Sequence, residues 1–414
     1  MASKRLSAVD ARNEKEEQDV INMSAVKIAA TCIIHAFVLG DILTFGLFTT
    51  SLSLAMGGIS SGSVIFIGDM KYLIFLCSGI VVGPLRNQNP ARYSRPLSIV
   101  GCILWSLGLG LTVPFETNYS TFAGLYVALS GLGAGMLYWN TMAMIPSWCT
   151  RSTYPIAFFV VSLSPYLYTV VFASVVANIT PTSPTSLWSD VYVGTSSLAS
   201  VVVFICSLIV TPAQFSKDLA SGPHDSPVTL LLFFLGVYAY QTAYYVPFVH
   251  VSQYMTVGLG ESEEHAAYVM NAIGGGSMAG KFVLFPLTIA MEHSFGDLGL
   301  RGLTMLTTLG TAITLFSWLA CTSSTSMVIF AVFYGLFSAG TMMAMHYLCS
   351  VSWMAWDYTT RTAWLALART LGEATAAFTV RFGLVDSGIN APIYFSASFA
   401  MFAAVVFCVM TIRG

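Results

Sequence analysis

Twelve apolar segments constrain this 414-residue chain more than any other feature. A helix of about 20 apolar residues crosses roughly 30 Å of hydrocarbon, and each segment is about that long. The segments are centred near Ile34, Ile74, Leu104, Leu129, Val161, Val202, Phe234, Ile273, Leu309, Val332, Ala374 and Ala400. With 56% hydrophobic and 9% charged residues, the chain has too few polar side chains to cover a soluble globule of this size. The sequence predicts an all-α integral membrane protein with twelve transmembrane helices.

The basic residues predict the orientation of these helices. All but four of the 17 Lys and Arg residues lie in the N-terminal region or in connections on one side of the predicted membrane. These residues are Lys4, Arg5, Arg12, Lys15, Lys27, Arg86, Arg92, Arg95, Arg151, Lys217, Arg301, Arg361 and Arg413. The connections on the other side, around Gly58, Thr117, Pro184, Gly260, Ser323 and Asp386, contain no Lys or Arg. The positive-inside rule therefore predicts a multi-pass protein with both termini cytoplasmic, and the plasma membrane is the default location.

Two N-x-Ser/Thr sequons agree with this topology. Asn118 and Asn178 both fall in connections predicted to face outward, where glycosylation takes place. The sequence leaves open whether either residue is glycosylated.

Motifs for catalysis or for metal binding do not occur in the sequence. There is no HExxH zinc motif and no Walker A motif, and the eight cysteines lie in or beside apolar segments without a CxxC pair. Cysteines in such positions are typical of small apolar packing residues. The sequence predicts neither an enzyme nor a protein with a metal or another cofactor.

A polar stretch from Thr211 to Pro227 separates six apolar segments from six others. We therefore expect a disordered cytoplasmic tail over residues 1–24, an N-terminal bundle over 25–212, a cytoplasmic linker over 213–227 and a C-terminal bundle over 228–414. Two six-helix bundles joined in this way are the architecture of the major facilitator superfamily, whose halves rock about a substrate site near the membrane midplane.

Particular motifs resemble those of the monocarboxylate transporter family, including its fungal and protist branches. In the first half these are Gly131-Leu-Gly-Ala-Gly135, Ile145-Pro-Ser-Trp-Cys-Thr-Arg151 and Pro155-Ile-Ala157. In the second half, Tyr245-Val-Pro-Phe248 and Gly258-Leu-Gly-Glu-Ser-Glu-Glu-His-Ala-Ala267 are similar to helix seven and to the acidic turn that precedes helix eight.

The chain also departs from the family pattern. Ala25-Val-Lys27 stands where the family has an acidic-glycine-aromatic signature. In helix eight, where the family commonly places an Asp and an Arg four residues apart, this chain has Ser277 and Lys281.

The resemblance implies a secondary transporter that moves a small organic anion by alternating access, most simply a monocarboxylate with a proton. The alternatives are a transporter of another metabolite, such as a vitamin, an amino acid or a larger organic acid, and a non-transporting membrane receptor or scaffold. The expected partners are the anion, protons and the lipid bilayer, with no nucleic acid. The fold usually works as a monomer, and an accessory subunit is left open.

Charged residues inside apolar segments are the candidate site residues, because each costs roughly 2.5–3.5 kcal/mol at a helix centre. They are Asp41, Asp69, Lys71, Lys281, Arg369 and Glu373, with Arg381 near a helix end. Lys281 follows a glycine-rich stretch and matches the basic position of helix eight, so we expect it to bind the anion. The alternative is a lysine whose ammonium extends to the cytoplasmic interface.

Arg369 and Glu373 stand four residues apart, which predicts an intrahelical ion pair. That pair either stabilises the bundle, or lets substrate compete for Arg369 while Glu373 takes up the coupled proton. Asp41 is the other candidate for proton coupling, with Lys71 or Lys281 as its partner, and its alternative role is a fixed structural pair.

Lys71, Asn140, Tyr244 and Tyr245 are the further predicted substrate-binding residues. Lys71 is expected to line the outer half of the pathway, and the other three to shape a binding cavity. The glycine pairs Gly131/Gly135 and Gly276/Gly280 predict close helix contacts, which a rocking interface requires.

Overall fold

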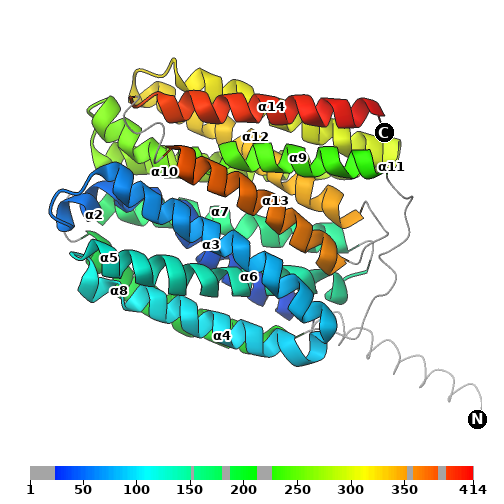
Figure 1. Cartoon of the computed structure of the whole chain (residues 1–414), viewed down its shortest axis with the longest axis horizontal. Helices are drawn as coiled ribbons and strands as arrows, with labels where there is room; N and C mark the ends of the chain where they lie inside the picture. The colour runs from blue at the N-terminus through cyan, green and yellow to red at the C-terminus, as the bar shows by residue number, and fades with distance from the viewer. Residues whose placement is uncertain are drawn as a thin grey trace, which may run out of the picture.

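The computed structural model describes residues 24–150, 153–179, 187–211, 226–351, 358–380 and 388–413. Within these ranges the chain is helical and contains no strand. The helices lie side by side along the longest axis of the molecule (Figure 1).

The first six crossings are built from single and composite helices. The first crossing, Ser24–Ala55, ends in η1 (Phe45–Phe48) and α2 (Thr49–Ala55), and α3 (Ser61–Gln88) and α4 (Pro90–Gly110) follow. The fourth crossing begins after η2 (Val113–Phe115) and consists of α5 (Tyr119–Ala123), η3 (Gly124–Ser130), α6 (Gly131–Met144) and η4 (Ile145–Trp148). The fifth and sixth crossings are α7 (Tyr154–Ile179) and α8 (Leu187–Ile209).

The last six crossings begin with a composite of α9 (Pro227–Tyr244), α10 (Val246–Gln253) and η5 (Tyr254–Gly258). Next comes α11 (Glu263–Trp318), which contains two helices joined at Gly296. Its φ of 58° lies in the left-handed region, which glycine adopts without a Cβ penalty. The last three crossings are α12 (Ser324–Val351), α13 (Tyr358–Thr379) and α14 (Ala391–Arg413).

Each predicted apolar segment coincides with one of these crossings. Eight of the described helices are long and apolar enough by themselves to span a membrane, and α11, as one of them, supplies two crossings. The crossings alternate in direction, so one end of the molecule holds Ser24, Asn89, Gly296 and Arg413. We call this the terminal end, and the end that holds Gly260 the opposite end.

The helices form two bundles of six crossings. Figure 1 shows the helices up to residue 211 in its lower part and those from residue 226 in its upper part. Contacts of α13 with α3 and of α11 with α7 join the two bundles. This arrangement confirms the predicted all-α fold. The predicted tail and most of the predicted linker lie outside the described residues.

Polar residues at the starts of several helices explain where those helices begin. Ser60, Asn89, Ser226 and Ser262 each precede a helix and accept a hydrogen bond from a backbone amide of its first turn. Such N-caps satisfy amides that have no partner within the helix. In this way short polar connections set the helix boundaries.

The two glycine pairs do allow close helix contacts, but not between the bundles. A Cβ on Gly135 would lie 2.4 Å from the Phe75 carbonyl oxygen, and one on Gly276 would lie 2.3 Å from that of Val332. Both contacts are between helices of one bundle, since α6 packs on α3 and α11 packs on α12. The prediction that these glycines form the rocking interface is therefore wrong, because they bring helices together inside each bundle.

Among the described glycines, the one that approaches backbone of the other bundle most closely is Gly46. A Cβ there would lie 2.1 Å from the carbonyl oxygen of Phe248 in α10. We predict that Gly46→Val lowers the free energy of unfolding by about 1–3 kcal/mol, because an added side chain overpacks a contact made by backbone. The midpoint of thermal unfolding of the purified protein measures this effect.

Gly124→Val is the matched control, because a Cβ on Gly124 has no neighbouring atom within 4 Å. Equal losses of stability in the two variants would show that the Gly46 contact does not hold the bundles together.

Candidate functional site

A cavity of about 40 Å³ lies between the two bundles. Its lining residues are His35, Leu39, Tyr72, Tyr138, Met142, Phe158, Ser162, Pro165, Tyr166, Tyr244, Lys281, Met342, Met343, His346 and Arg369. A cavity measured in this way needs about 10–15 Å³ to hold one water, so this one has room for only a few waters. The structure is thus a closed conformation in which both bundles contribute to one central cavity.

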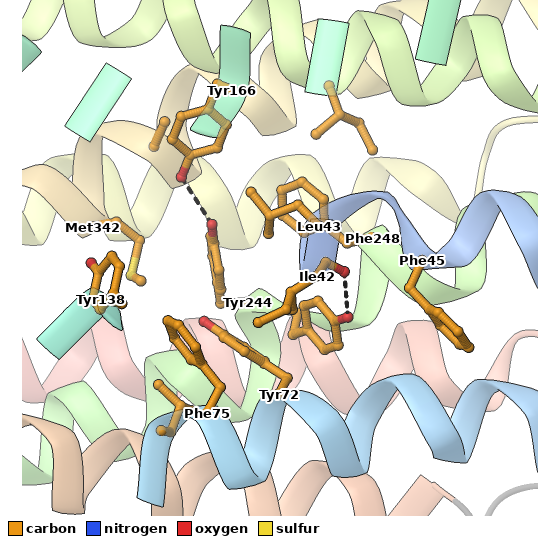
Figure 2. Close-up of a cluster of buried hydrophobic side chains, with 14 of the residues drawn as sticks. Ile42, Leu43, Phe45, Tyr72, Phe75, Tyr138, Tyr166, Tyr244, Phe248 and Met342 are labelled. Atoms are coloured by element: carbon orange, nitrogen blue, oxygen red, sulfur yellow. Dashed lines mark hydrogen bonds between the residues drawn. The ribbon is translucent and has the colours of Figure 1, made fainter. Parts of the chain in front are cut away.

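Tyrosine rings converge on this cavity from both bundles, as Figure 2 shows. The hydroxyls of Tyr166 in α7 and Tyr244 in α9 are joined by a hydrogen bond of 2.9 Å. Tyr72 and Tyr138 belong to the same cluster and line the same cavity. These hydroxyls give an otherwise apolar site several hydrogen-bonding groups.

Arg369 of α13 is the centre of the polar network around the cavity, and it is 2% exposed. Its guanidinium donates to the Tyr72 hydroxyl at 2.6 Å and to Gln241 Oε1 at 2.9 Å, and lies 3.3 Å from His346 Nε2. The bond to Tyr72 crosses from one bundle to the other. None of these three partners is a carboxylate. The guanidinium is therefore hydrogen-bonded, but none of these partners pairs its positive charge.

Gln241 of α9 lies between Arg369 and Glu373. It accepts from Arg369 through Oε1 and donates to Glu373 Oε2 through Nε2 at 3.1 Å. No direct ion pair between Arg369 and Glu373 occurs in the described part of the chain. The predicted intrahelical ion pair is therefore wrong, because a glutamine from a neighbouring helix bridges the two side chains.

Lys281 of α11 lines the same cavity and is 2% exposed. Its ammonium lies 5.2 Å from the centre of the Tyr166 ring, within the range of a cation–π interaction. Among the residues that the structure describes, Lys281 has no hydrogen-bonding or ion-pair partner. The side chain does not extend to the membrane interface, so this alternative for Lys281 is wrong.

Asp41 and Lys71 form a buried ion pair away from the cavity. The Lys71 ammonium also lies 3.6 Å from the centre of the Tyr126 ring, and the Tyr126 hydroxyl lies 3.5 Å from Asp41 Oδ1. Lys71 is thus the partner of Asp41, and the expected place of Lys71 on the lining of the pathway is not observed in this conformation.

Two other predicted residues, Asn140 and Tyr245, are held by contacts outside the cavity lining. Asn140 donates to the Ser94 carbonyl oxygen at 2.7 Å and to Ser98 Oγ at 2.9 Å, which turns it toward α4. Tyr245 donates to the Ile42 carbonyl oxygen at 2.8 Å and so joins the two bundles. Tyr244 is the member of the predicted aromatic set that lines the cavity.

Side chains close the cavity toward both ends of the molecule. Toward the terminal end, Tyr347 of α12 packs against Tyr154 and Phe158 of α7, with each pair of ring centres 6.5 Å apart. Toward the opposite end, the Gly46–Phe248 and Ile42–Tyr245 contacts join the bundles. A substrate can reach the cavity only after one of these groups of contacts separates.

Several residues of the network were missed in the sequence, namely Gln241, Tyr72 and Tyr166. These side chains carry no charge, so the free-energy cost of placing them in an apolar segment does not distinguish them from packing residues. Gln241 gave the one available signal, because an amide buried in a membrane helix needs hydrogen-bonding partners.

Comparisons with known proteins agree with this fold. No protein-family model matches the chain. It is 25% identical over 354 residues to the MFS-type transporter pynF of Aspergillus niger, covering 82% of this chain and 76% of that protein. It is 21% identical over 297 residues to the MFS transporter asaE of Aspergillus flavus, covering 69% of this chain and 63% of that protein.

Solved structures give a closer match in shape than in sequence. A D-xylose–proton symporter superposes with a TM-score of 0.68 at 12% identity, over 93% of this chain and 96% of that one. The xylose transporter XylE of E. coli, in a partially occluded inward-open conformation, gives a TM-score of 0.67 over the same shares. The chain has the major facilitator fold, and the two Aspergillus proteins that it resembles in sequence are both described as MFS transporters. They do not single out the monocarboxylate branch.

The Asp41–Lys71 pair allows a test of whether it is structural. We predict that Lys71→Met lowers the free energy of unfolding by about 3–5 kcal/mol, because it leaves Asp41 buried without its cation. The double variant Asp41→Leu/Lys71→Met should recover most of that loss, since it removes both charges. Thermal unfolding of the wild type, both single variants and the double variant forms a double-mutant cycle, which measures the coupling free energy between Asp41 and Lys71.

Proposed function

We propose that this chain is a secondary transporter that moves a small organic anion by alternating access, most simply a monocarboxylate with a proton. The observation that carries this proposal is the buried Lys281 ammonium, which lines the central cavity and has no carboxylate partner within the described residues. Arg369 lines the same cavity and hydrogen-bonds to groups without negative charge.

Two cations in one apolar cavity favour an anionic ligand on electrostatic grounds. A buried charge is costly unless it is paired, and a carboxylate between Lys281 and Arg369 would supply the missing negative charge. The tyrosine hydroxyls and the His346 ring can hydrogen-bond other polar atoms of the same molecule. The site therefore suits a small acid.

Alternating access accounts for the closed cavity. With contacts formed at both ends, the conformation corresponds to an occluded state between inward-facing and outward-facing forms. Opening at the terminal end would separate Tyr347 from Tyr154 and Phe158. Opening at the opposite end would separate Phe248 from Gly46. Each motion moves one bundle relative to the other and enlarges the cavity to admit substrate.

Proton coupling is proposed through Glu373, with Asp41 as the second candidate. Protonation of Glu373 removes the negative charge nearest to Arg369 beyond the Gln241 bridge. Arg369 would then attract the substrate more strongly, which couples proton binding to anion binding. Asp41 could contribute by exchanging Lys71 for a proton.

The orientation and organisation are proposed on the charge pattern. The excess of Lys and Arg near the terminal end favours cytoplasmic termini. The polar stretch from Thr211 to Pro227 favours bundles bounded at residues 25–212 and 228–414. A monomer in the plasma membrane is taken as the default for this fold.

A neutral, hydroxyl-rich metabolite is the second candidate substrate. Four tyrosines line the cavity, and their hydroxyls can hydrogen-bond a polyol. Structures of similar shape include a symporter of D-xylose. Such a substrate would leave the charges of Lys281 and Arg369 unpaired, which makes it the less favoured of the two.

The test is uptake of labelled lactate, pyruvate, D-xylose and a wider panel of organic acids into proteoliposomes, with and without an inward proton gradient. We predict that an acid is taken up and that the gradient stimulates its uptake. Lys281→Gln should weaken apparent affinity roughly ten- to hundred-fold, the worth of one charge-assisted hydrogen bond. Lys281→Arg, which keeps the charge, should retain part of the activity.

Arg413→Gln is the matched control, since it removes an exposed positive charge at the end of α14. Uptake of D-xylose without uptake of any acid would contradict the anion proposal. Unchanged acid uptake in Lys281→Gln would remove Lys281 from the binding site and leave transport itself in place.

A further inference from the structure

A second cavity, of about 350 Å³, lies toward the opposite end between α3, α10 and the last two crossings. Its lining residues include Ser60, Ile65, Phe66, Asp69, His250, Gln253, Val380 and Ile389. It is much larger than the central cavity. It lies near the C-terminal end of α13, whereas Arg369, earlier in the same helix, lines the central cavity. None of its polar residues belongs to the substrate site described above.

Asp69 lines this second cavity and is 6% exposed. In the described ranges it has no hydrogen bond and no ion pair. An isolated carboxylate in a membrane interior is costly when ionised, so it either binds a cation or carries a proton. Asp69 is therefore a buried acid that faces an open space without a fixed partner.

The packing of α3 against α13 places Asp69 opposite Glu373. The two helices run in opposite directions, and two cross-contacts fix their register. Phe66 packs on Phe378 with ring centres 6.1 Å apart, and the Tyr72 hydroxyl accepts from Arg369 at 2.6 Å. On α3, Asp69 lies midway between Phe66 and Tyr72.

On α13, Glu373 lies between the partners of those two residues. Glu373 is 1% exposed and lies within electrostatic range of both Asp69 and Arg369. Tyr245, at the start of α10, interacts electrostatically with both acids. Two carboxylates from different bundles thus face each other at the interface.

The other charged and titratable groups around this pair form no ion pair with it among the described residues. His250 of α10 lines the second cavity, and Tyr245 is a neutral hydroxyl that already donates to Ile42. Lys71 follows Asp69 by two residues, on another side of α3, and pairs with Asp41. Arg369 is separated from Glu373 by Gln241. Two carboxylates that face each other in a low-dielectric interior repel one another when both are ionised, so a shared proton would stabilise the pair.

We propose that Asp69 and Glu373 form a proton-binding pair that exchanges its proton with the second cavity. The charge of the pair influences Arg369 through Gln241, which hydrogen-bonds to both Glu373 and Arg369. The proton enters from the opposite end through the cavity beside Asp69. Its binding halves the negative charge of the pair, and its loss restores a second negative charge that competes with the substrate for Arg369. This coupling role rests on the proposed transport function, whereas proton binding by the pair does not.

Infrared difference spectroscopy of the purified wild-type protein tests proton binding without any substrate. A protonated carboxylic acid has a carbonyl stretch that an ionised one lacks, so on lowering the pH the pair should contribute a band that appears while exposed carboxyls are still ionised. We predict that Asp69→Asn and Glu373→Gln each shift the pH midpoint of this band and that the double variant loses it. Glu264→Gln, which changes an acid outside the two cavities, should leave it unchanged.

Retention of the wild-type band and midpoint in the double variant would overturn the proposal. Loss of the band on adding sodium at constant pH would also overturn it, because the pair would then bind a metal cation. Asn and Gln mimic the protonated acids, so we expect the single variants to remain folded. A monodisperse size-exclusion profile checks this.

Uptake of labelled pyruvate into proteoliposomes tests the coupling role separately. The proton gradient should stimulate wild-type uptake, and Asp69→Asn should reduce it to the rate seen without a gradient while pyruvate exchange across the membrane continues. Stimulation that persists in Asp69→Asn and Glu373→Gln would overturn the coupling role and leave the transport function standing. If the wild type moves no acid of the panel, the proposed function fails, and the infrared result still decides whether the pair binds a proton.

Discussion

The buried guanidinium of Arg369 is the interaction on which the arrangement of the bundle interface depends. An arginine remains charged inside a protein, and here its hydrogen-bonding partners Tyr72, Gln241 and His346 supply no negative charge. The bond to Tyr72 joins the two bundles, and the bond to Gln241 orients the side chain. The structure therefore satisfies the geometry of the guanidinium without neutralising it, which leaves an attraction for an anion at the centre of the molecule.

Aromatic rings explain how the chain tolerates two buried cations in the absence of substrate. The Lys281 ammonium lies 5.2 Å from the centre of the Tyr166 ring, and the Arg369 guanidinium carbon lies 6.0 Å from that of Trp139. Cation–π interactions contribute about 0.5–2 kcal/mol, which is less than a close carboxylate provides in such a site. The rings lower the cost of the empty state without competing strongly with an acid. An anionic substrate of the proposed kind would add a negative charge beside Lys281 and Arg369, where none of the cavity-lining side chains carries one.

Charge and hydrophobicity made much of the fold and part of the site predictable, because both are properties of single residues. The crossings follow from the apolar segments, and Lys281 and Arg369 stand out as charges inside them. Pairwise contacts between distant helices were not predictable. The spacing of Arg369 and Glu373 suggested an ion pair, but Gln241 from α9 binds both, and a local rule cannot reveal a third helix. Asn140 was likewise expected at the cavity, whereas its amide hydrogen-bonds to α4.

The three acids that are buried among the described residues differ in which group balances their charge. The geometry of α3 explains the difference between Asp41 and Asp69. Residues two apart on a helix lie on different sides, so Lys71 faces Asp41 while Asp69 faces α13. Asp41 therefore has a fixed cation within its own bundle. Asp69 instead meets Glu373 of the other bundle. Two acids that face each other across the interface repel one another unless a proton is present, and this pair lies between the bundles, which separate when the opposite end opens. Protonation would hold this part of the interface together, and loss of the proton would favour its separation, which links the charge of the pair to the motion of the bundles.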